Sequence, residues 1–286
     1  MNGRLLSDIV NLLLYGGAFI GLCAASITAL TFDLVANSAS FFPYVILIGV
    51  STAALYSAHR VIGLHKLDHV KTSDRFTVIR KYKIHIWLYC AIWIILSVWF
   101  LLPLFSLNFL LLLIPGGSIG LAYVLPFLSN GRRLRDFGWA KIVMIGWSWG
   151  WLTAFIPAFY FLNLPVFLCV LLGIERMLFI IAITIPFEIR DITIDRSVGL
   201  HTMPSRFGMK QTMVTGNILC IGFVLISALL AFHFLDPGYF IATLLIAIMT
   251  WWLIRRSATM KNDYFFSGLT DGTMILVLIL HWIISY

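Results

Sequence analysis

The chain has 286 residues, of which 61% are hydrophobic and only 11% are charged. Soluble globular domains average about 25% charged residues, so this composition excludes a disordered chain, a disulfide scaffold and an ordinary water-soluble enzyme. The formal net charge is +8, which in a soluble protein would suggest nucleic acid as a partner. The composition instead indicates a polytopic membrane protein, and the positions of the basic residues decide what the charge means.

Nine apolar runs are long enough to cross a bilayer. A hydrocarbon core of about 30 Å needs about 20 apolar residues in helical form. Backbone groups in lipid must be satisfied internally, which favours helices in runs of this length. The predicted spans are 9–31, 41–63, 84–102, 107–128, 138–160, 164–186, 211–232, 238–254 and 270–286. We therefore predict one all-α integral membrane domain over residues 1–286, with the first span retained because it lacks a small-residue cleavage site.

Lysine and arginine are concentrated in every second connection. Arg4 precedes the first span, and basic residues lie at or between spans two and three, four and five, six and seven, and eight and nine. The other connections contain no Lys or Arg, and Arg176 lies deep inside a span. The positive-inside rule then predicts a cytoplasmic N-terminus, cytoplasmic basic connections and an external C-terminus. Topology accounts for the surplus charge, so we expect a multi-pass protein of the cytoplasmic or inner membrane that binds no nucleic acid.

The most informative polar stretch follows the sixth span and begins at Glu188. Asp191 and Asp195 are four residues apart, so on a helix their side chains share one face about 5–6 Å apart. Two carboxylates so placed suit Mg²⁺, which commonly bridges protein carboxylates and substrate phosphates. Arg190 flanks the pair, and its guanidinium suits phosphate oxygens. Taken alone, the pair is equally well explained as a solvated helix end whose charges neutralise each other.

The longer pattern around these aspartates is more specific. It reads DxxxDxxxGxxTxPxxxG from Asp191 to Gly208. This string resembles the second aspartate motif of the UbiA superfamily of membrane prenyltransferases. The resemblance implies a bundle of nine transmembrane helices with a cytoplasmic-side active-site cavity. It also implies an enzyme that moves a polyprenyl group from its diphosphate to an aromatic or lipid acceptor with the assistance of Mg²⁺, with Asp191 and Asp195 as its catalytic and metal-binding residues.

Two further stretches resemble elements of the same superfamily. Residues 120–138 contain a tyrosine, a proline and an arginine-rich turn, as the family does between its fourth and fifth spans. Residues 71–75 match the basic element that follows the family's first aspartate motif. The resemblance therefore assigns diphosphate binding to a set of basic and phenolic side chains: Arg190, Lys71, Arg75, Tyr123, Arg132 and Arg133.

The first aspartate motif of the family is missing from this chain. Counting back from residues 71–75, its aspartates fall on His59, Ile62 and Lys66. We expect His59, Arg60 and Lys66 to contact the diphosphate directly in place of a metal, because cationic side chains bind phosphate. Two other interpretations stay open: an inactive homologue that binds an isoprenoid or lipid phosphate, and a structural membrane subunit.

Charged and aromatic residues also occur inside the spans. Glu175 and Arg176 lie near the middle of span six, where charge is costly and usually faces the bundle interior. Neighbours on a helix point about 100° apart, so each is expected to have its own partner. Span five contributes candidates for lining an isoprenoid tunnel: Trp147, Trp149 and Trp151.

Overall fold

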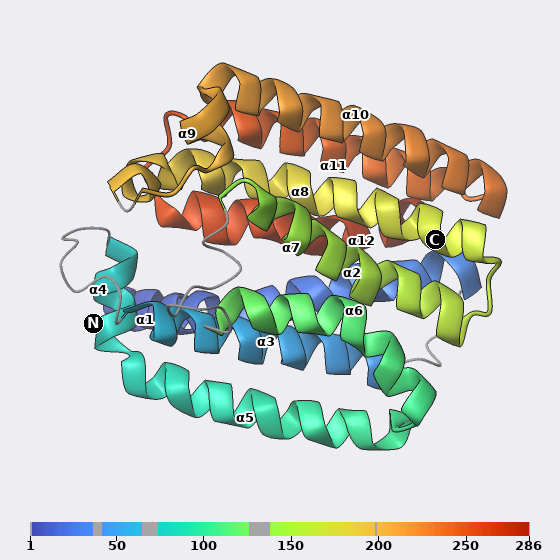
Figure 1. Cartoon of the computed structure of the whole chain (residues 1–286), viewed down its shortest axis with the longest axis horizontal. Coiled ribbons are helices and arrows are strands. Elements are labelled where there is room, and N and C mark those ends of the chain that lie inside the picture. Colours follow the sequence, from blue (N-terminus) through green and yellow to red (C-terminus); the bar gives the residue numbers. More distant parts are fainter. Residues whose placement is uncertain (1, 37–41, 65–73, 126–137, 198, 286) are drawn as a thin grey trace.

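The computed structural model describes residues 2–36, 42–64, 74–125, 138–197 and 199–285, and every regular element within these ranges is helical (Figure 1). The helices in chain order are α1 (Asn2–Tyr15), α2 (Ala18–Ala36), α3 (Phe42–Leu64), α4 (Asp74–Lys81), α5 (Lys83–Leu101), α6 (Leu107–Val124), α7 (Ala140–Gly150), α8 (Val166–Ser197), α9 (Met203–Phe207), α10 (Met209–Phe234), α11 (Pro237–Arg256) and α12 (Asp271–Ser285). A short 3₁₀ segment, η2 (Leu102–Leu104), extends α5. Three π-helical segments adjoin α7 and α12: η5 (Trp151–Phe155), η6 (Pro157–Phe161) and η7 (Phe265–Thr270).

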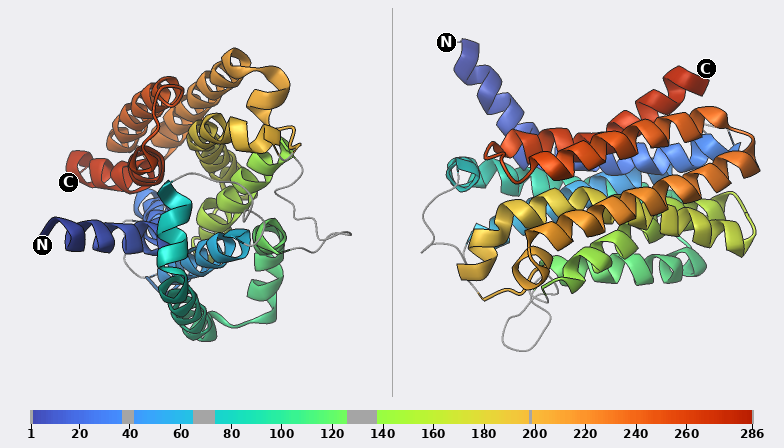
Figure 2. Two further views of the ribbon diagram at one scale, coloured as in Figure 1. Left: turned by 90° about the vertical axis from the view of Figure 1, so that its left-hand side faces the viewer. Right: turned by 90° about the horizontal axis from the view of Figure 1, so that it is seen from above.

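Nine helical runs in the described residues are long and apolar enough to cross a membrane. This agrees with the predicted all-α class and with the number of predicted spans. The long helices lie side by side along the longest axis, and α4 and α9 lie at the same end, together with the start of α1 (Figures 1 and 2). We refer to this end as the α9 end. The share of buried residues is highest in the spans of α2 and α8, at 61% and 56%, and lowest in those of α5 and α6, at 11% and 17%. Helices α2 and α8 are therefore central in the bundle, and α5 and α6 are peripheral.

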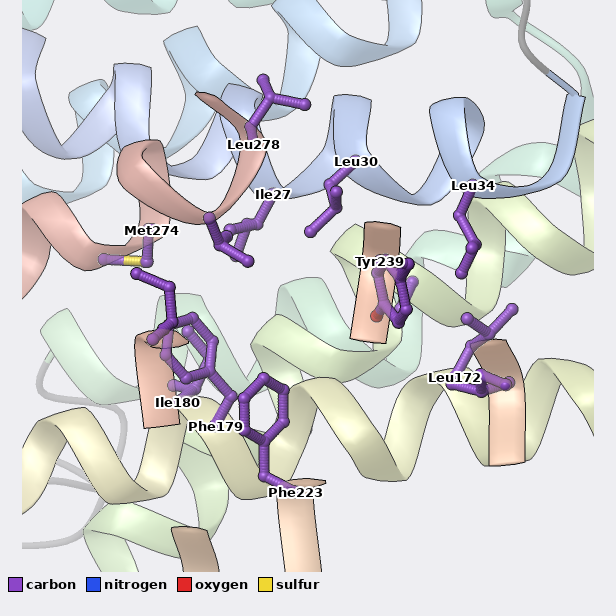
Figure 3. Close-up of a cluster of buried hydrophobic side chains, with 14 of the residues drawn as sticks. Ile27, Leu30, Leu34, Leu172, Phe179, Ile180, Phe223, Tyr239, Met274 and Leu278 are labelled. Carbon is purple, nitrogen blue, oxygen red and sulfur yellow. The ribbon is translucent and has the colours of Figure 1, made fainter. Parts of the chain in front are cut away.

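Small side chains and close-packed apolar ones hold the central helices together. The largest buried cluster joins α2, α8, α10, α11 and α12 (Figure 3). Within it, the rings of Phe179 and Phe223 stack with centroids 5.0 Å apart. Because lipid is as apolar as leucine, such contacts stabilise the bundle through packing density rather than through escape from water.

The first predicted span begins too early. A break at Gly17, whose φ is +87°, separates α1 from the crossing helix, which runs over Ala18–Val35. A Cβ atom on Gly17 would lie 2.4 Å from the carbonyl oxygen of Ala53, so α2 and α3 approach too closely there for a larger residue. The sixth predicted span ends too early, because α8 continues to Ser197, beyond the predicted end at residue 186.

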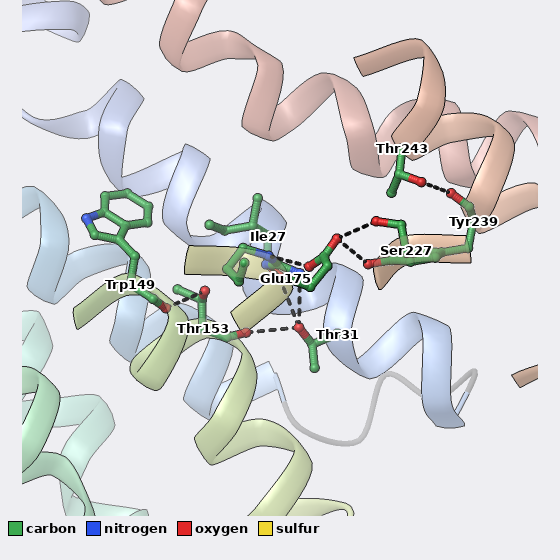
Figure 4. Close-up of polar contacts among 9 residues, drawn as sticks. Ile27, Thr31, Trp149, Thr153, Glu175, Ser227, Tyr239 and Thr243 are labelled. Carbon is green, nitrogen blue, oxygen red and sulfur yellow. Dashed lines mark hydrogen bonds and ion pairs between the residues drawn. The ribbon is translucent and has the colours of Figure 1, made fainter. Parts of the chain in front are cut away.

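The buried charges of α8 are satisfied from two sides (Figure 4). Arg176 donates to the carbonyl of Ile27 and to Thr31 Oγ1, both on α2. Glu175 Oε1 accepts hydrogen bonds of 3.0 Å from Ser227 of α10 and from Tyr239 of α11. The two charged groups also approach each other, with 3.7 Å between Arg176 Nε and Glu175 Oε2. As expected, each has its own partners, and together they join α8 to three neighbouring helices.

A second polar cluster lies at the end of the bundle opposite the α9 end. His281 of α12 is 1% exposed, and its ring lies between two carboxylates. Its Nδ1 is 2.9 Å from Asp33 Oδ2, and its Nε2 is 2.7 Å from Asp236 Oδ2. Asp236 also caps α11 by accepting from the backbone N–H of Tyr239. Burial acts to raise the pKa of Asp236, but the hydrogen bonds from His281 and Tyr239 outweigh it and hold that pKa below its ordinary value of 3.8.

We expect the substitution Asp236→Asn to lower the stability of the purified protein at about pH 7 by about 1–2 kcal/mol, the value of hydrogen bonds to a charged group. A carboxyl with a depressed pKa contributes stability above its ordinary pKa and loses it as the pH falls through the folded-state value. The stability difference between wild type and variant should therefore shrink at acid pH, below about 4. Thermal unfolding in detergent across the pH range measures this difference, and a difference independent of pH would contradict it.

Candidate active site

The acidic end of α8 projects toward the α9 end of the bundle. The helix has 32 residues, which is about 48 Å at 1.5 Å per residue and exceeds a hydrocarbon core of about 30 Å. Its last turns therefore extend past the apolar region, and they carry Glu188, Asp191 and Asp195. The two aspartates are one turn apart, but Asp195 pairs with a lysine of α7 and Asp191 pairs with an arginine of α8 itself.

Asp195 and Glu188 share a lysine of α7. Lys141 Nζ is 2.7 Å from Glu188 Oε1 and 3.5 Å from Asp195 Oδ2. The three side chains are 10%, 3% and 7% exposed, so the ion pairs are almost completely removed from water. Glu188 and Asp195 are seven residues apart, which places them two turns apart on one face of α8.

Asp191 is paired with its neighbour on α8. Arg190 Nε and Nη2 contact its two carboxylate oxygens at 2.8 and 3.1 Å, and Arg190 Nη1 reaches Asp263 at 3.3 Å. The guanidinium also lies over the rings of Phe187 and Phe266, 5.1 Å from each centroid. Arg190 thus acts first as the counter-ion of two aspartates. The Asp191 side chain remains 25% exposed, which makes it the more accessible aspartate of the motif.

The predicted cationic pair of α3 diverges. The ring of His59 lies against that of Tyr123 on α6, with centroids 5.6 Å apart. Arg60 instead points to α1, where it donates to the carbonyl of Leu14 and lies 5.4 Å from the ring centroid of Tyr15. Of the two, His59 is therefore the one placed beside a predicted diphosphate ligand on a neighbouring helix.

Tyr15 of α1 lies beside Arg60 at the α9 end, and the charge of Asp263 also acts on its phenol. Burial, together with the negative charge of Asp263, raises the pKa of Tyr15 to about 12, against the opposing charge of Arg60. The phenol therefore stays neutral at physiological pH. The contacts of Arg60 with Tyr15 and Leu14 join α1 to α3 at the α9 end.

An apolar cavity of about 210 Å³ lies between α3, α6 and α7. Tyr56 and Gly120 line it, each three residues before His59 and Tyr123, so the cavity starts about one helical turn from the His59–Tyr123 pair and extends toward the middle of the bundle. Of the three candidate tryptophans, Trp149 lines this cavity. Trp147 and Trp151 stack on each other, 5.7 Å between centroids, and line a different pocket against α8.

Several predicted ligands of the diphosphate fall outside the described residues: Lys66, Lys71, Arg132 and Arg133. Arg75 lies in the first turn of α4, and its side chain is likewise outside the described part. Their roles stay predictions. The structure does bring together Asp191, Asp195 and Arg190 at one helix end, and it places the His59–Tyr123 pair above the cavity.

Sequence reasoning missed the part played by Lys141 and Glu188. In the sequence, Lys141 is one of the basic residues near the connection between spans four and five, which indicates topology and no specific partner. Glu188 had a usable signal, since it lies seven residues before Asp195 on the same helix face. No comparable signal identifies Lys141, because its contact depends on how α7 packs against α8.

The comparisons with known proteins agree with this architecture. The sequence profile of the UbiA prenyltransferase family matches residues 65–267, which is more than half of the chain. The chain therefore belongs to the UbiA prenyltransferase family. Among curated proteins it is similar to the 4-hydroxybenzoate octaprenyltransferases of Salmonella paratyphi C (strain RKS4594) and Salmonella enteritidis PT4 (strain P125109). Each is 25% identical over 183 residues, which cover 63% of this chain and 60% of the relative.

Solved structures share the fold. A UbiA homolog from Archaeoglobus fulgidus bound to GPP and Mg²⁺ superimposes with a TM-score of 0.64 at 12% identity, covering 96% of this chain and 99% of that one. The apo structure of a UbiA homolog from Aeropyrum pernix K1 gives a TM-score of 0.63 at 16% identity, with 93% and 95% coverage. At such low sequence identities, the TM-scores show a common helical fold and nothing more.

Proposed function

We propose that this protein transfers a polyprenyl group from its diphosphate to a hydrophobic acceptor, either an aromatic compound or a lipid. The observation that carries the proposal is the juxtaposition of two elements at the α9 end. One is the acidic end of α8, and the other is the apolar cavity that starts beside the His59–Tyr123 pair. A prenyl diphosphate has the matching division, with a charged head and a long apolar tail. The curated relatives are named as octaprenyltransferases.

The two aspartates of the motif suit one Mg²⁺ whose coordination would be completed by the phosphates of the substrate. Among the described residues, no group of three or more His, Cys, Asp and Glu side chains could hold a metal ion. Mg²⁺, however, is usually bound through one or two carboxylates together with substrate phosphates. Asp191 and Asp195 supply such a pair, and Asp191 is a quarter exposed. When bound, the ion would neutralise charge on the departing diphosphate.

The protein's own side chains provide the remaining steps. As the bond between the allylic carbon and the diphosphate oxygen breaks, its electron pair leaves with the oxygen. His59 and Lys66, which stand in the sequence where the first aspartate motif is missing, are proposed to stabilise that charge. The cavity would hold the tail and exclude water from the allylic cation. The acceptor then attacks the carbon and gives up a proton.

A second candidate function is an inactive homologue that binds an isoprenoid or lipid phosphate. Two observations favour considering it: His59 and Lys66 stand where the family has metal-binding aspartates, and Lys141 already pairs with Asp195. The two candidates differ in whether diphosphate is released.

The substitution Asp191→Asn is expected to reduce diphosphate release and prenylated product by about a hundred-fold, because one transition-state charge contact is lost. The assay uses protein in lipid nanodiscs with Mg²⁺, donors from geranyl to octaprenyl diphosphate, and 4-hydroxybenzoate or a glycerolipid acceptor. Asp8→Asn is the matched control, because Asp8 is an exposed residue of α1 that pairs with Lys81 of α4. Wild-type protein that binds the donors but releases no diphosphate would identify the inactive homologue instead.

The substitution Gly117→Leu tests whether the cavity holds the tail. A Cβ atom on Gly117 would meet no atom within 4 Å, so a side chain there enters open space without disturbing the packing. We expect kcat/KM for long donors to fall about ten-fold more than for dimethylallyl diphosphate, since binding energy of the tail supports the reaction. Ile114→Phe, on an exposed position of α6, is the control. An equal loss for short and long donors would place the tail elsewhere.

A further inference from the structure

Lys141 is an unusual charge because it is buried at the acidic end of α8 rather than exposed in a basic connection. Its side chain is 10% exposed and lies in the first turn of α7. Gly138, with φ of +64°, comes just before this helix, and a Cβ atom there would lie 2.3 Å from the carbonyl oxygen of His201. The start of α7 is therefore held against the segment that follows α8, and Lys141 has little freedom to leave its carboxylates.

The contacts of Lys141 are unequal. It lies closer to Glu188, at 2.7 Å, than to Asp195, at 3.5 Å. Glu188 thus holds the ammonium near Asp195, and the ion pair with Asp195 is the weaker of the two.

Cations of the protein already pair with the carboxylates at the end of α8. Lys141 is shared by Glu188 and Asp195, and Arg190 is shared by Asp191 and Asp263. A divalent ion that binds at these carboxylates therefore competes with cations that the protein itself supplies.

We infer that Lys141 is a built-in counter-ion that competes with a divalent cation for Asp195 and so weakens metal binding at the acidic end of α8. The inference rests on the proposed function, because it concerns the same aspartates. Lys141 is a positioning residue in this scheme: it acts through Asp195, and Glu188 sets how strongly it does so. A purely structural ion pair would stabilise the α7–α8 contact and leave metal binding unchanged.

The experiment measures Mn²⁺ binding by electron paramagnetic resonance on the full chain in nanodiscs, with and without geranyl thiolodiphosphate, an unreactive donor analogue. Lys141→Met removes the competing charge, and we expect it to bind Mn²⁺ about ten-fold more tightly than wild type. Glu188→Gln releases the ammonium to Asp195, and we expect it to bind about ten-fold more weakly. The double variant should resemble Lys141→Met within about twofold, because Glu188 acts only through the lysine.

Two further variants protect the interpretation. Lys141→Arg keeps the cation and should bind Mn²⁺ like wild type, and Lys210→Met, an exposed lysine on α10, controls for loss of a surface charge. If Lys141→Met does not fold, the test compares the Mn²⁺ affinity of the double variant, which has lost one charge of each sign, with that of Glu188→Gln. Mn²⁺ affinity that is equal in wild type and Lys141→Met, or a Glu188→Gln effect that is the same with and without Lys141, would overturn the inference.

The same data separate this inference from the proposed function. Mn²⁺ binding to wild type with no response to Lys141 overturns the counter-ion role and leaves the proposed metal site standing. Binding that occurs only after Lys141 is removed supports the counter-ion role and overturns Mg²⁺ assistance in the natural protein. Absence of binding in every folded variant overturns both.

Discussion

The cost of placing charge inside an apolar bundle governs how α8 is built. A carboxylate removed from water needs a counter-charge or several donors. The central helix meets this need at two depths. In its middle, Glu175 and Arg176 contact each other and draw donors and acceptors from α2, α10 and α11. At its end, Glu188 and Asp195 share Lys141, and α7 is thereby joined to the site. Among the described residues, the most buried charges therefore also fix the neighbours of a central helix.

This pairing determines what the two aspartates of the motif can do. Asp195 is enclosed and tied to α7, so it is positioned but scarcely accessible. Asp191 is paired with Arg190 in a bidentate contact and remains partly exposed. Under the proposed function, a ligand that approaches the α9 end would reach Asp191 before Asp195, and it would compete there with Arg190. The aspartates are equivalent in the sequence pattern and differ in their surroundings.

The sequence was sufficient for the features that repeat or that follow from local geometry. Apolar run length predicted nine spans, and the DxxxD spacing placed Asp191 and Asp195 on one continuous helix. The split between α1 and α2 was missed because the apolar run continues through it, although the Gly16–Gly17 pair was an available signal. The contact between Lys141 and Glu188 could not be predicted, because it depends on how two helices pack and not on spacing within either one. For the same reason His59 and Arg60, adjacent in the sequence, could not be assigned to α6 and α1 in advance.

The chain departs from the family's first aspartate motif, and the carboxylates of its second motif already have a cation beside them. His59 and Lys66 stand in the sequence where the resemblance expects metal-binding aspartates, and Lys141 pairs with Asp195. Lys141 is present before any ligand binds, so it neutralises buried carboxylates and avoids the cost of unpaired buried charge. In return it offers one unit of charge and no Lewis acidity. Under the proposed function, catalysis would therefore depend more heavily on an ion held at Asp191 and on the fit of the donor's tail.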